Sequence, residues 1–377
     1  MANAYRAWLV LVAVLTAALS AAAMLFNMVV DPWCLLDATR IPGINARKTR
    51  VEYFDRLYKA FAIGRVRPEV VILGSSRAEA AFRPEHPALA RLGRGFNLAL
   101  PNASIVEMRC YFDSARRAGT VRGAVVVLDL IAFGAANASD CPRDLEIARS
   151  PLRASAVFFS MSMLLDGVRT IGDQRRGVPA YIGATGQSTS AFWVELVRRA
   201  GGVRRAFEMD RDQYQKHMYR FDAAGLSAPH GRRALEAFRG IVGAILDARM
   251  ASAFVVSPVH AEDFKVMAEL GLLPLFESWK RDMVRILADE ARKRAVPAPK
   301  LWDFSADHPY NREPFVSADG REATMHWWWG AAHYSEALGD RMLDRIFLGE
   351  SDADFGIALD AANVDAPGAR RDAGSGR

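Results

Sequence analysis

The sequence predicts an α/β protein: a three-layer α/β/α sandwich around a five-stranded parallel sheet, preceded by one N-terminal transmembrane helix. Short apolar runs alternate with segments of helical periodicity, which is typical of a parallel sheet covered on both faces. The chain also opens with an uncharged apolar stretch that is long enough to cross a bilayer. The expected strands are 70–74, 95–100, 124–130, 252–258 and 301–305.

The bulk composition narrows the class of protein. A chain of 377 residues with 51% hydrophobic residues can bury a full core. Its net charge of +6 suits nucleic acid, anionic lipid or an acidic glycan. However, the basic residues are scattered among acids, with no basic block interleaved with aromatics, so nucleic acid is disfavoured as a partner.

The cysteines favour neither a metal site nor a disulfide framework. Cys34, Cys110 and Cys141 lack the spacing of zinc ligands, and three cysteines are too few for a dense network of bridges. A single bridge between Cys110 and Cys141 stays open if the domain lies in an oxidising compartment. We expect no metal and no cofactor.

The N-terminal stretch has two interpretations. From Trp8 to Val30 the chain carries no charge, so a helix here matches the roughly 20 residues that span a bilayer. A cleaved signal peptide would use Arg6 as its charged region and 21–23 as its small-residue cleavage site. The apolar stretch continues beyond that site, which favours an uncleaved anchor over residues 1–30. The flanking charges leave the orientation open.

After the anchor, residues 31–350 are expected to form one α/β domain. A segment at about 140–230 interrupts the alternation of strands and helices, and we interpret it as an insertion that caps the sheet. Ser104 and Glu107 form a capping box that starts a helix. The polar, glycine-rich tail, 351–377, is expected to be largely disordered.

The strongest functional signal is the end of the first strand. The apolar run 70–73 stops at Gly74-Ser75-Ser76-Arg77, a turn that can present a serine nucleophile at the edge of a sheet. An ordinary turn is the alternative, because glycine and serine are common turn residues. His333 precedes a late amphipathic helix, and a serine needs such a base to lose its proton. We therefore predict that Ser76 and His333 lie within hydrogen-bond reach, about 2.6–3.2 Å.

Other polar residues follow the remaining strands of the predicted sheet. Ligands of an open parallel sheet gather at the carboxyl ends of its strands. Asn102, Asp303 and His260 fall at such ends, and Arg77 follows the candidate nucleophile. His260 is equally well interpreted as a packing residue and as a substrate contact.

Taken together, the ordered motifs resemble the SGNH/GDSL hydrolase superfamily. Within it, the chain is similar to a membrane-anchored bacterial branch related to the alginate O-acetylation and teichoic-acid D-alanylation proteins. The resemblance covers most of residues 25–360 and implies the flavodoxin-like fold of that superfamily. The matching segments are 27–33, 43–45, 72–77, 96–104, 127–130, 257–262, 279–281 and 332–335.

The resemblance also implies roles for individual residues. The family's Gly-Asp-Ser block falls on 74–76, which makes Ser76 the implied nucleophile. The family's oxyanion hole combines a backbone amide after this turn with a glycine amide, at the position of Asn102, and an asparagine side chain. Two positions depart from the pattern: Phe133 stands near the asparagine position, and Gly330 stands where the family has the acid that orients its histidine.

These implications define the expected function. Because Gly330 has no side chain, Asp303 or a backbone carbonyl is expected to orient His333. The resemblance implies a serine acyl-ester hydrolase or O-acyltransferase that acts on a cell-envelope glycan. We expect a single-pass protein of the inner membrane with its domain in the periplasm, and an acyl-transfer protein is a further candidate partner. The alternative is a catalytically inactive glycan-binding or assembly factor, and a purely structural membrane partner is a weaker third option.

Overall fold

The chain divides into two compact units. One, here called the anchor unit, comprises residues 1–62 and 143–182, and the other, the α/β unit, comprises 63–142 and 183–377. The insertion expected at 140–230 is therefore not one element, because its first half belongs to the anchor unit. The computed structural model describes residues 2–134, 140–219, 221, 225–315, 324–349 and 354–366.

The anchor unit begins with the long helix α1 (Ala2–Val30), whose side chains are mostly exposed. It is long and apolar enough to cross a membrane, with a mean hydropathy of 2.5. At the end of the helix, side chains donate hydrogen bonds to carbonyl groups that have no partner within the helix. Lys48 Nζ donates to the carbonyl oxygens of Val30 at 3.0 Å and Asp31 at 2.9 Å, and Asn45 Nδ2 donates to that of Val29 at 2.8 Å.

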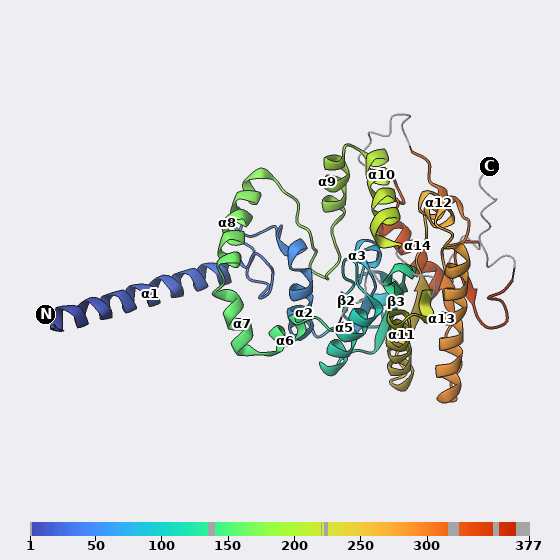
Figure 1. The fold of residues 1–377 in the computed structure, drawn as a ribbon, viewed down its shortest axis with the longest axis horizontal. Helices are drawn as coiled ribbons and strands as arrows, with labels where there is room; N and C mark the ends of the chain where they lie inside the picture. Colours follow the sequence, from blue (N-terminus) through green and yellow to red (C-terminus); the bar gives the residue numbers. More distant parts are fainter. Residues whose placement is uncertain are drawn as a thin grey trace. The chain divides into compact units, whose positions relative to one another are not determined.

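Shorter helices pack around the end of α1 (Figure 1). They are α2 (Asp55–Val66), which continues into the α/β unit, α6 (Asp144–Arg149), α7 (Pro151–Phe158) and α8 (Met161–Arg176). Their apolar core contains Trp33, Leu35, Leu57, Phe158 and Met163. The segment 143–182 is thus tied to residues that it follows by more than a hundred positions in the sequence.

The α/β unit contains a six-stranded sheet in the order β2-β1-β3-β4-β5-β6. All five expected strands are present and pair in parallel. The expected number of strands, five, was wrong, because a sixth strand pairs antiparallel with β5. The strands are β1 (Val70–Leu73), β2 (Gly95–Asn97), β3 (Gly123–Leu128), β4 (Ala251–Val256), β5 (Leu301–Asp303) and β6 (Ile357–Leu359).

Strand β6 lies in the tail that was expected to be largely disordered. It pairs Ile357, Ala358 and Leu359 with β5, and Leu359 is buried. The polar composition of the tail concealed a strand of only three residues. The parts of that prediction for 351–353 and 367–377 lie outside the described residues.

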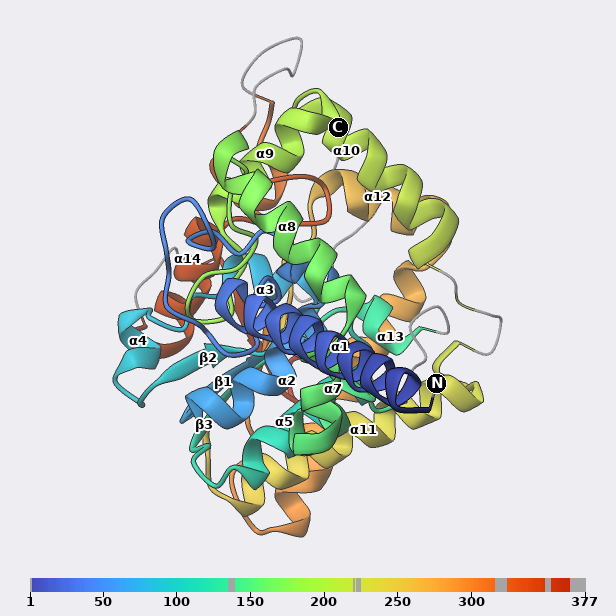
Figure 2. The same cartoon turned by 90° about the vertical axis from the view of Figure 1, so that its left-hand side faces the viewer.

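Helices cover both faces of the sheet (Figures 1 and 2). Ala253 and Val255 of β4 share one apolar cluster with Leu338 of α14, while the ring of Phe254 contacts Phe238 of α11. Helices α5, α11 and α13 pack in series, and α3 packs against α14. The helices of this unit are α3 (Ser76–Ala81), α4 (Pro87–Ala90), α5 (Ile105–Arg117), α9 (Ser190–Ala200), α10 (Val203–Gln213), α11 (Pro229–Asp247), α12 (Ala261–Glu269), α13 (Leu273–Lys293) and α14 (Glu336–Phe347).

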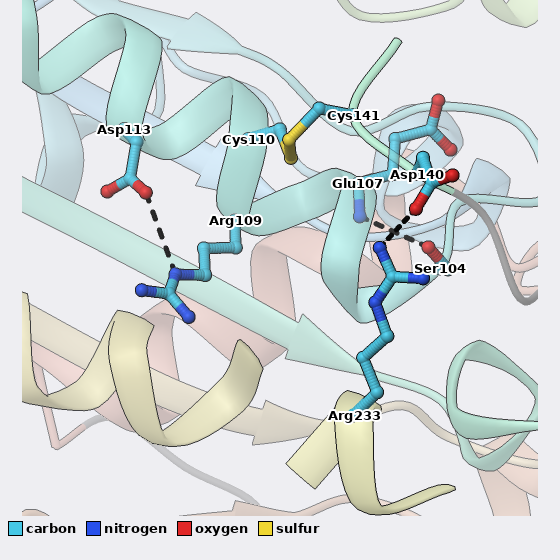
Figure 3. The surroundings of a disulfide bond; sticks show 8 residues. All are labelled: Ser104, Glu107, Arg109, Cys110, Asp113, Asp140, Cys141 and Arg233. Carbon is cyan, nitrogen blue, oxygen red and sulfur yellow. Dashed lines mark hydrogen bonds and ion pairs between the residues drawn. A yellow bond between two sulfur atoms is a disulfide. The ribbon is translucent and has the colours of Figure 1, made fainter. Parts of the chain in front are cut away.

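Figure 3 shows two details of α5, a helix cap that the sequence predicted and a disulfide that the sequence left open. The hydroxyl of Ser104 accepts a hydrogen bond from the backbone amide of Glu107 at 3.1 Å, which confirms the N-terminal cap. Cys110 forms a disulfide with Cys141, with the two Cα atoms 5.6 Å apart. Cys34 is not part of a disulfide and is buried, and burial raises the pKa of its thiol to about 12.

The contact between α3 and α14 depends on Gly339. A Cβ atom at this position would lie 2.1 Å from the carbonyl oxygen of Ala81, so Gly339→Ala forces the two helices apart. We expect a loss of about 1–3 kcal/mol in the free energy of unfolding, as for other overpacked cores. Gly64→Ala is the matched control in α2, because nothing lies within 4 Å of its added Cβ, and we expect it to be neutral or stabilising by up to about 1 kcal/mol. Urea unfolding of the detergent-solubilised protein measures both, and equal effects would contradict this packing.

Candidate functional site

The structure brings Ser76 and His333 together, as the sequence predicts. Ser76 is the first residue of α3, directly after β1, and His333 lies in the loop that precedes α14. Ser76 Oγ lies 2.9 Å from His333 Nε2, and both residues are partly buried. The pair therefore has the geometry of a hydroxyl and the base that takes its proton.

The turn before α3 fixes which serine faces the histidine. The hydroxyl of Ser75 accepts a hydrogen bond from the amide of Arg77 at 3.2 Å and donates to Asp129 Oδ2 at 2.5 Å. Gly74 allows the tight approach, because a Cβ there would lie 2.5 Å from a side chain of α3. Ser75 is thus engaged as a helix cap, and Ser76 is left as the candidate nucleophile.

Arg77 is not a substrate contact, which corrects one sequence prediction. Its guanidinium is buried and lies 2.8 Å from Asp263 Oδ2, 3.4 Å from Asp129 Oδ1 and 3.1 Å from the hydroxyl of Tyr214. The hydroxyl of Tyr219 also donates to Asp263, at 3.0 Å. A buried charge needs such partners, so this cluster holds Arg77 inside the protein behind the turn.

His333 is neutral at physiological pH. Burial, followed by the positive charge of Arg77, lowers the pKa of its imidazole to about 3. Nε2 can therefore accept a proton from Ser76, although such a low pKa makes the imidazole a weaker base than one tuned to neutral pH. The ring of Trp193, from α9, lies 4.5 Å from the imidazole and packs against it.

The prediction that Asp303 orients His333 is wrong. The Asp303 carboxylate is fully buried and accepts hydrogen bonds from Lys280 Nζ at 2.9 Å and from Ser305, whose amide and hydroxyl lie at 2.8 and 2.6 Å. Lys280 is itself buried on α13 and needs a counter-charge. Within the described part of the chain, no carboxylate makes a hydrogen bond to His333.

A carboxylate from another element occupies the space beside Gly330. A Cβ at Gly330 would lie 2.3 Å from Oδ2 of Asp210, on α10, and the same oxygen accepts a hydrogen bond from the amide of Ala332 at 3.1 Å. Asp210 thus holds the loop that carries His333. Burial raises the pKa of Asp210 to about 7. Sequence reasoning missed this residue, because nothing in its spacing connects it to a loop more than a hundred residues away.

The two candidate oxyanion amides lie at the ends of neighbouring strands. Ser76 begins α3, so no carbonyl of its own helix accepts its amide proton. Asn102 is exposed after β2 with φ +55°, the left-handed conformation that asparagine tolerates. Phe133, near the position where the resembled family has an asparagine, is buried against Phe238 and Trp279, so its side chain offers no donor.

His260 caps a helix, which corrects its assignment as a substrate contact. Its Nδ1 accepts a hydrogen bond from the amide of Glu262 at the start of α12, at 3.2 Å. Nε2 lies 3.4 Å from the carbonyl oxygen of Glu313, and the ring packs against Phe207 and Trp328. The side chain is buried, so the packing interpretation prevails.

Comparison with models of known protein families and with curated proteins finds no match. Among the described residues, no group of three or more His, Cys, Asp or Glu side chains is placed to hold a metal ion. The chemistry of the site is that of a hydroxyl paired with a neutral imidazole at the carboxyl edge of a parallel sheet.

The raised pKa of Asp210 predicts a specific dependence of stability on pH. Because the pKa rises from 3.8 to about 7 on folding, the stabilising effect of the bound proton is complete below pH 3.8 and is lost as the pH passes through 7. Asp210→Asn removes this titration. Relative to wild type, the variant should gain about 2–3 kcal/mol in unfolding free energy between pH 5 and pH 8.

Urea unfolding at the two pH values checks this difference. Asp212→Asn is the control, because this neighbour on α10 has a side chain that is 58% exposed. A difference between the Asp210 variant and wild type that does not change with pH would show that the carboxyl is ionised throughout.

Proposed function

We propose that the protein is a membrane-anchored serine acyl-ester hydrolase or O-acyltransferase of the SGNH type. The observation that carries the proposal is the 2.9 Å contact between Ser76 Oγ and His333 Nε2 at the carboxyl edge of the sheet. The fold supports it, because the strand order β2-β1-β3-β4-β5 is that of flavodoxin-like sheets, which bind ligands at this edge. A cell-envelope glycan as the substrate follows from the family resemblance.

The proposed reaction uses the serine as a covalent carrier of the acyl group. Ser76 Oγ attacks the carbonyl carbon of the acyl ester while its proton passes to His333 Nε2. When the tetrahedral intermediate collapses, the ester bond breaks and His333 returns the proton to the departing alcohol. Water, or a hydroxyl of an acceptor glycan, then takes the acyl group by the reverse sequence and frees Ser76.

The negative charge of the tetrahedral intermediate needs hydrogen-bond donors. The backbone amides of Ser76 and Asn102 are the candidates. Ser76 is the first residue of α3, so its amide has no acceptor within the helix, and Asn102 lies in the loop after β2 at the same edge of the sheet. One such donor is worth roughly 3 kcal/mol of transition-state stabilisation. With Phe133 near the family's asparagine position, we expect a slower enzyme than one with a full set of donors.

The proposed location is the inner membrane, with the α/β unit in the periplasm. Helix α1 has the length and hydropathy of a single span. The disulfide between Cys110 and Cys141 favours an oxidising compartment, since such bonds are rare in the cytosol. Both observations also agree with a substrate in the cell envelope.

A catalytically inactive factor that binds a glycan is the second candidate. Its support is that the described residues include no carboxylate hydrogen-bonded to His333 and that Phe133 offers no oxyanion donor. In this alternative, the polar side chains of Ser76 and His333 contact a bound sugar, and no covalent step occurs.

Reaction with a fluorophosphonate probe separates the two candidates. We expect labelling of the full-length protein in detergent, with the adduct on Ser76 by peptide mapping and none in Ser76→Ala. His333→Ala should slow labelling by about 10²–10⁴-fold, the usual contribution of a general base. Ser278→Ala is the control, because that hydroxyl bonds only to its own helix. An adduct on Ser75, or no adduct, would favour the inactive factor.

The proposed periplasmic location predicts how many cysteine thiols can be alkylated before reduction. When denatured protein purified from cells without reductant is alkylated, mass spectrometry should find only Cys34 modified, and reduction should expose Cys110 and Cys141 as well. A C-terminal reporter that works only in the periplasm should also be active. Three free thiols before reduction, together with an inactive reporter, would place the domain in the cytosol.

A further inference from the structure

A second apolar surface lies on the anchor unit, where α7 and α8 meet at an angle of 53°. Met161, Leu165 and Val168 follow helical spacing and are exposed on one face of α8. The opposite face, with Met163 and Thr170, is buried within the unit. We call the exposed group the elbow surface, and its members are Leu152, Phe159, Met161, Leu165 and Val168.

The elbow is fixed to the last turns of α1. Asn27 Nδ2 donates to the carbonyl oxygen of Phe158 at 2.8 Å and lies 3.4 Å from that of Ser160, the residues that flank the bend. The ring of Phe26 packs directly on Gly167 of α8, where an added Cβ would lie 2.6 Å away. Figure 1 shows α7 and α8 beside the C-terminal part of α1, and both helices contact α1. The bend therefore lies at the level of Asn27.

The length of α1 determines where Asn27 lies relative to the bilayer. From Trp8 to Phe26 the helix is uncharged, and nineteen residues at a rise of about 1.5 Å each span about 28 Å. That length matches the hydrocarbon core of a bilayer, about 30 Å. When α1 crosses a bilayer, Asn27 lies at its surface, and the elbow surface lies there too.

We propose that the elbow surface inserts into the headgroup–acyl boundary of the same bilayer that α1 crosses. The proposal rests on the membrane anchoring proposed above. The last turns of α1, to which the elbow is fixed, also expose apolar side chains, including Leu25 and Val29. Arg175 and Arg176, exposed at the end of α8, suit the anionic headgroups of phospholipids.

Insertion would give the anchor unit two attachments to the membrane. A single span leaves whatever follows it free to rotate about the helix axis. A second attachment through the elbow, buried about 5–10 Å into the boundary as for other interfacial helices, holds the unit in one orientation on the bilayer.

Depth-dependent quenching tests the proposal on the full-length protein in vesicles of phosphatidylethanolamine and phosphatidylglycerol. An environment-sensitive fluorophore is placed at Phe159→Cys, Leu165→Cys, Leu15→Cys or Glu208→Cys. The native Cys34 is buried with a raised thiol pKa and does not react in the folded protein. Lipids carry a spin label either near the headgroup or near the bilayer centre.

The headgroup-proximal label should quench the fluorophore at Phe159→Cys and Leu165→Cys about twofold or more relative to Glu208→Cys, an exposed control on α10. Leu15→Cys should be quenched by the central label. If Leu15→Cys is quenched and both elbow positions are not, the elbow proposal fails while the anchoring stands. If Leu15→Cys is not quenched either, the anchoring itself fails. Unquenched elbow positions with cysteine cross-links between copies would assign the surface to a second copy instead.

Discussion

The buried charge of Arg77 is the constraint on which the site depends. A guanidinium removed from water requires partners, and it takes them from three separate elements: Asp129 after β3, Asp263 of α12 and the hydroxyl of Tyr214 beyond α10. Asp129 in turn accepts the hydrogen bond of Ser75. The cluster therefore fixes the turn after β1 in the orientation that directs the next serine to the imidazole.

The same cluster explains why the segment after residue 183 contributes to the site. Tyr214 ties the end of α10 to Arg77, and this places Asp210, one turn earlier, beside the loop of His333. Trp193 of the preceding helix covers the imidazole. Groups from α9 and α10 thus hold the loop that carries the base. In the resembled family, an acid of that loop, at the position of Gly330, orients the histidine. Burial by these groups, followed by the Arg77 charge, lowers the pKa of His333.

The sequence predicted the features that local patterns encode. Apolar runs predict five of the strands. The position of Ser76 after the first strand and that of His333 before a late helix predict the pair. Features that depend on long-range charge pairing were missed. Asp303 was assigned to His333 because strand ends converge, but the buried ammonium of Lys280 takes that carboxylate. Neither Asp210 nor the pairing of β6 leaves a local signal, since each is set by a partner distant in the sequence.

The most direct test of the account is a crystal structure of the protein after reaction with a fluorophosphonate. The adduct imitates the tetrahedral intermediate, so its oxygen reports where the negative charge is held. The account predicts phosphorus bonded to Ser76 Oγ, with the phosphonyl oxygen about 2.7–3.1 Å from the amide nitrogens of Ser76 and Asn102. A phosphonyl oxygen that points to solvent with no donor, or an unmodified Ser76, would contradict the account.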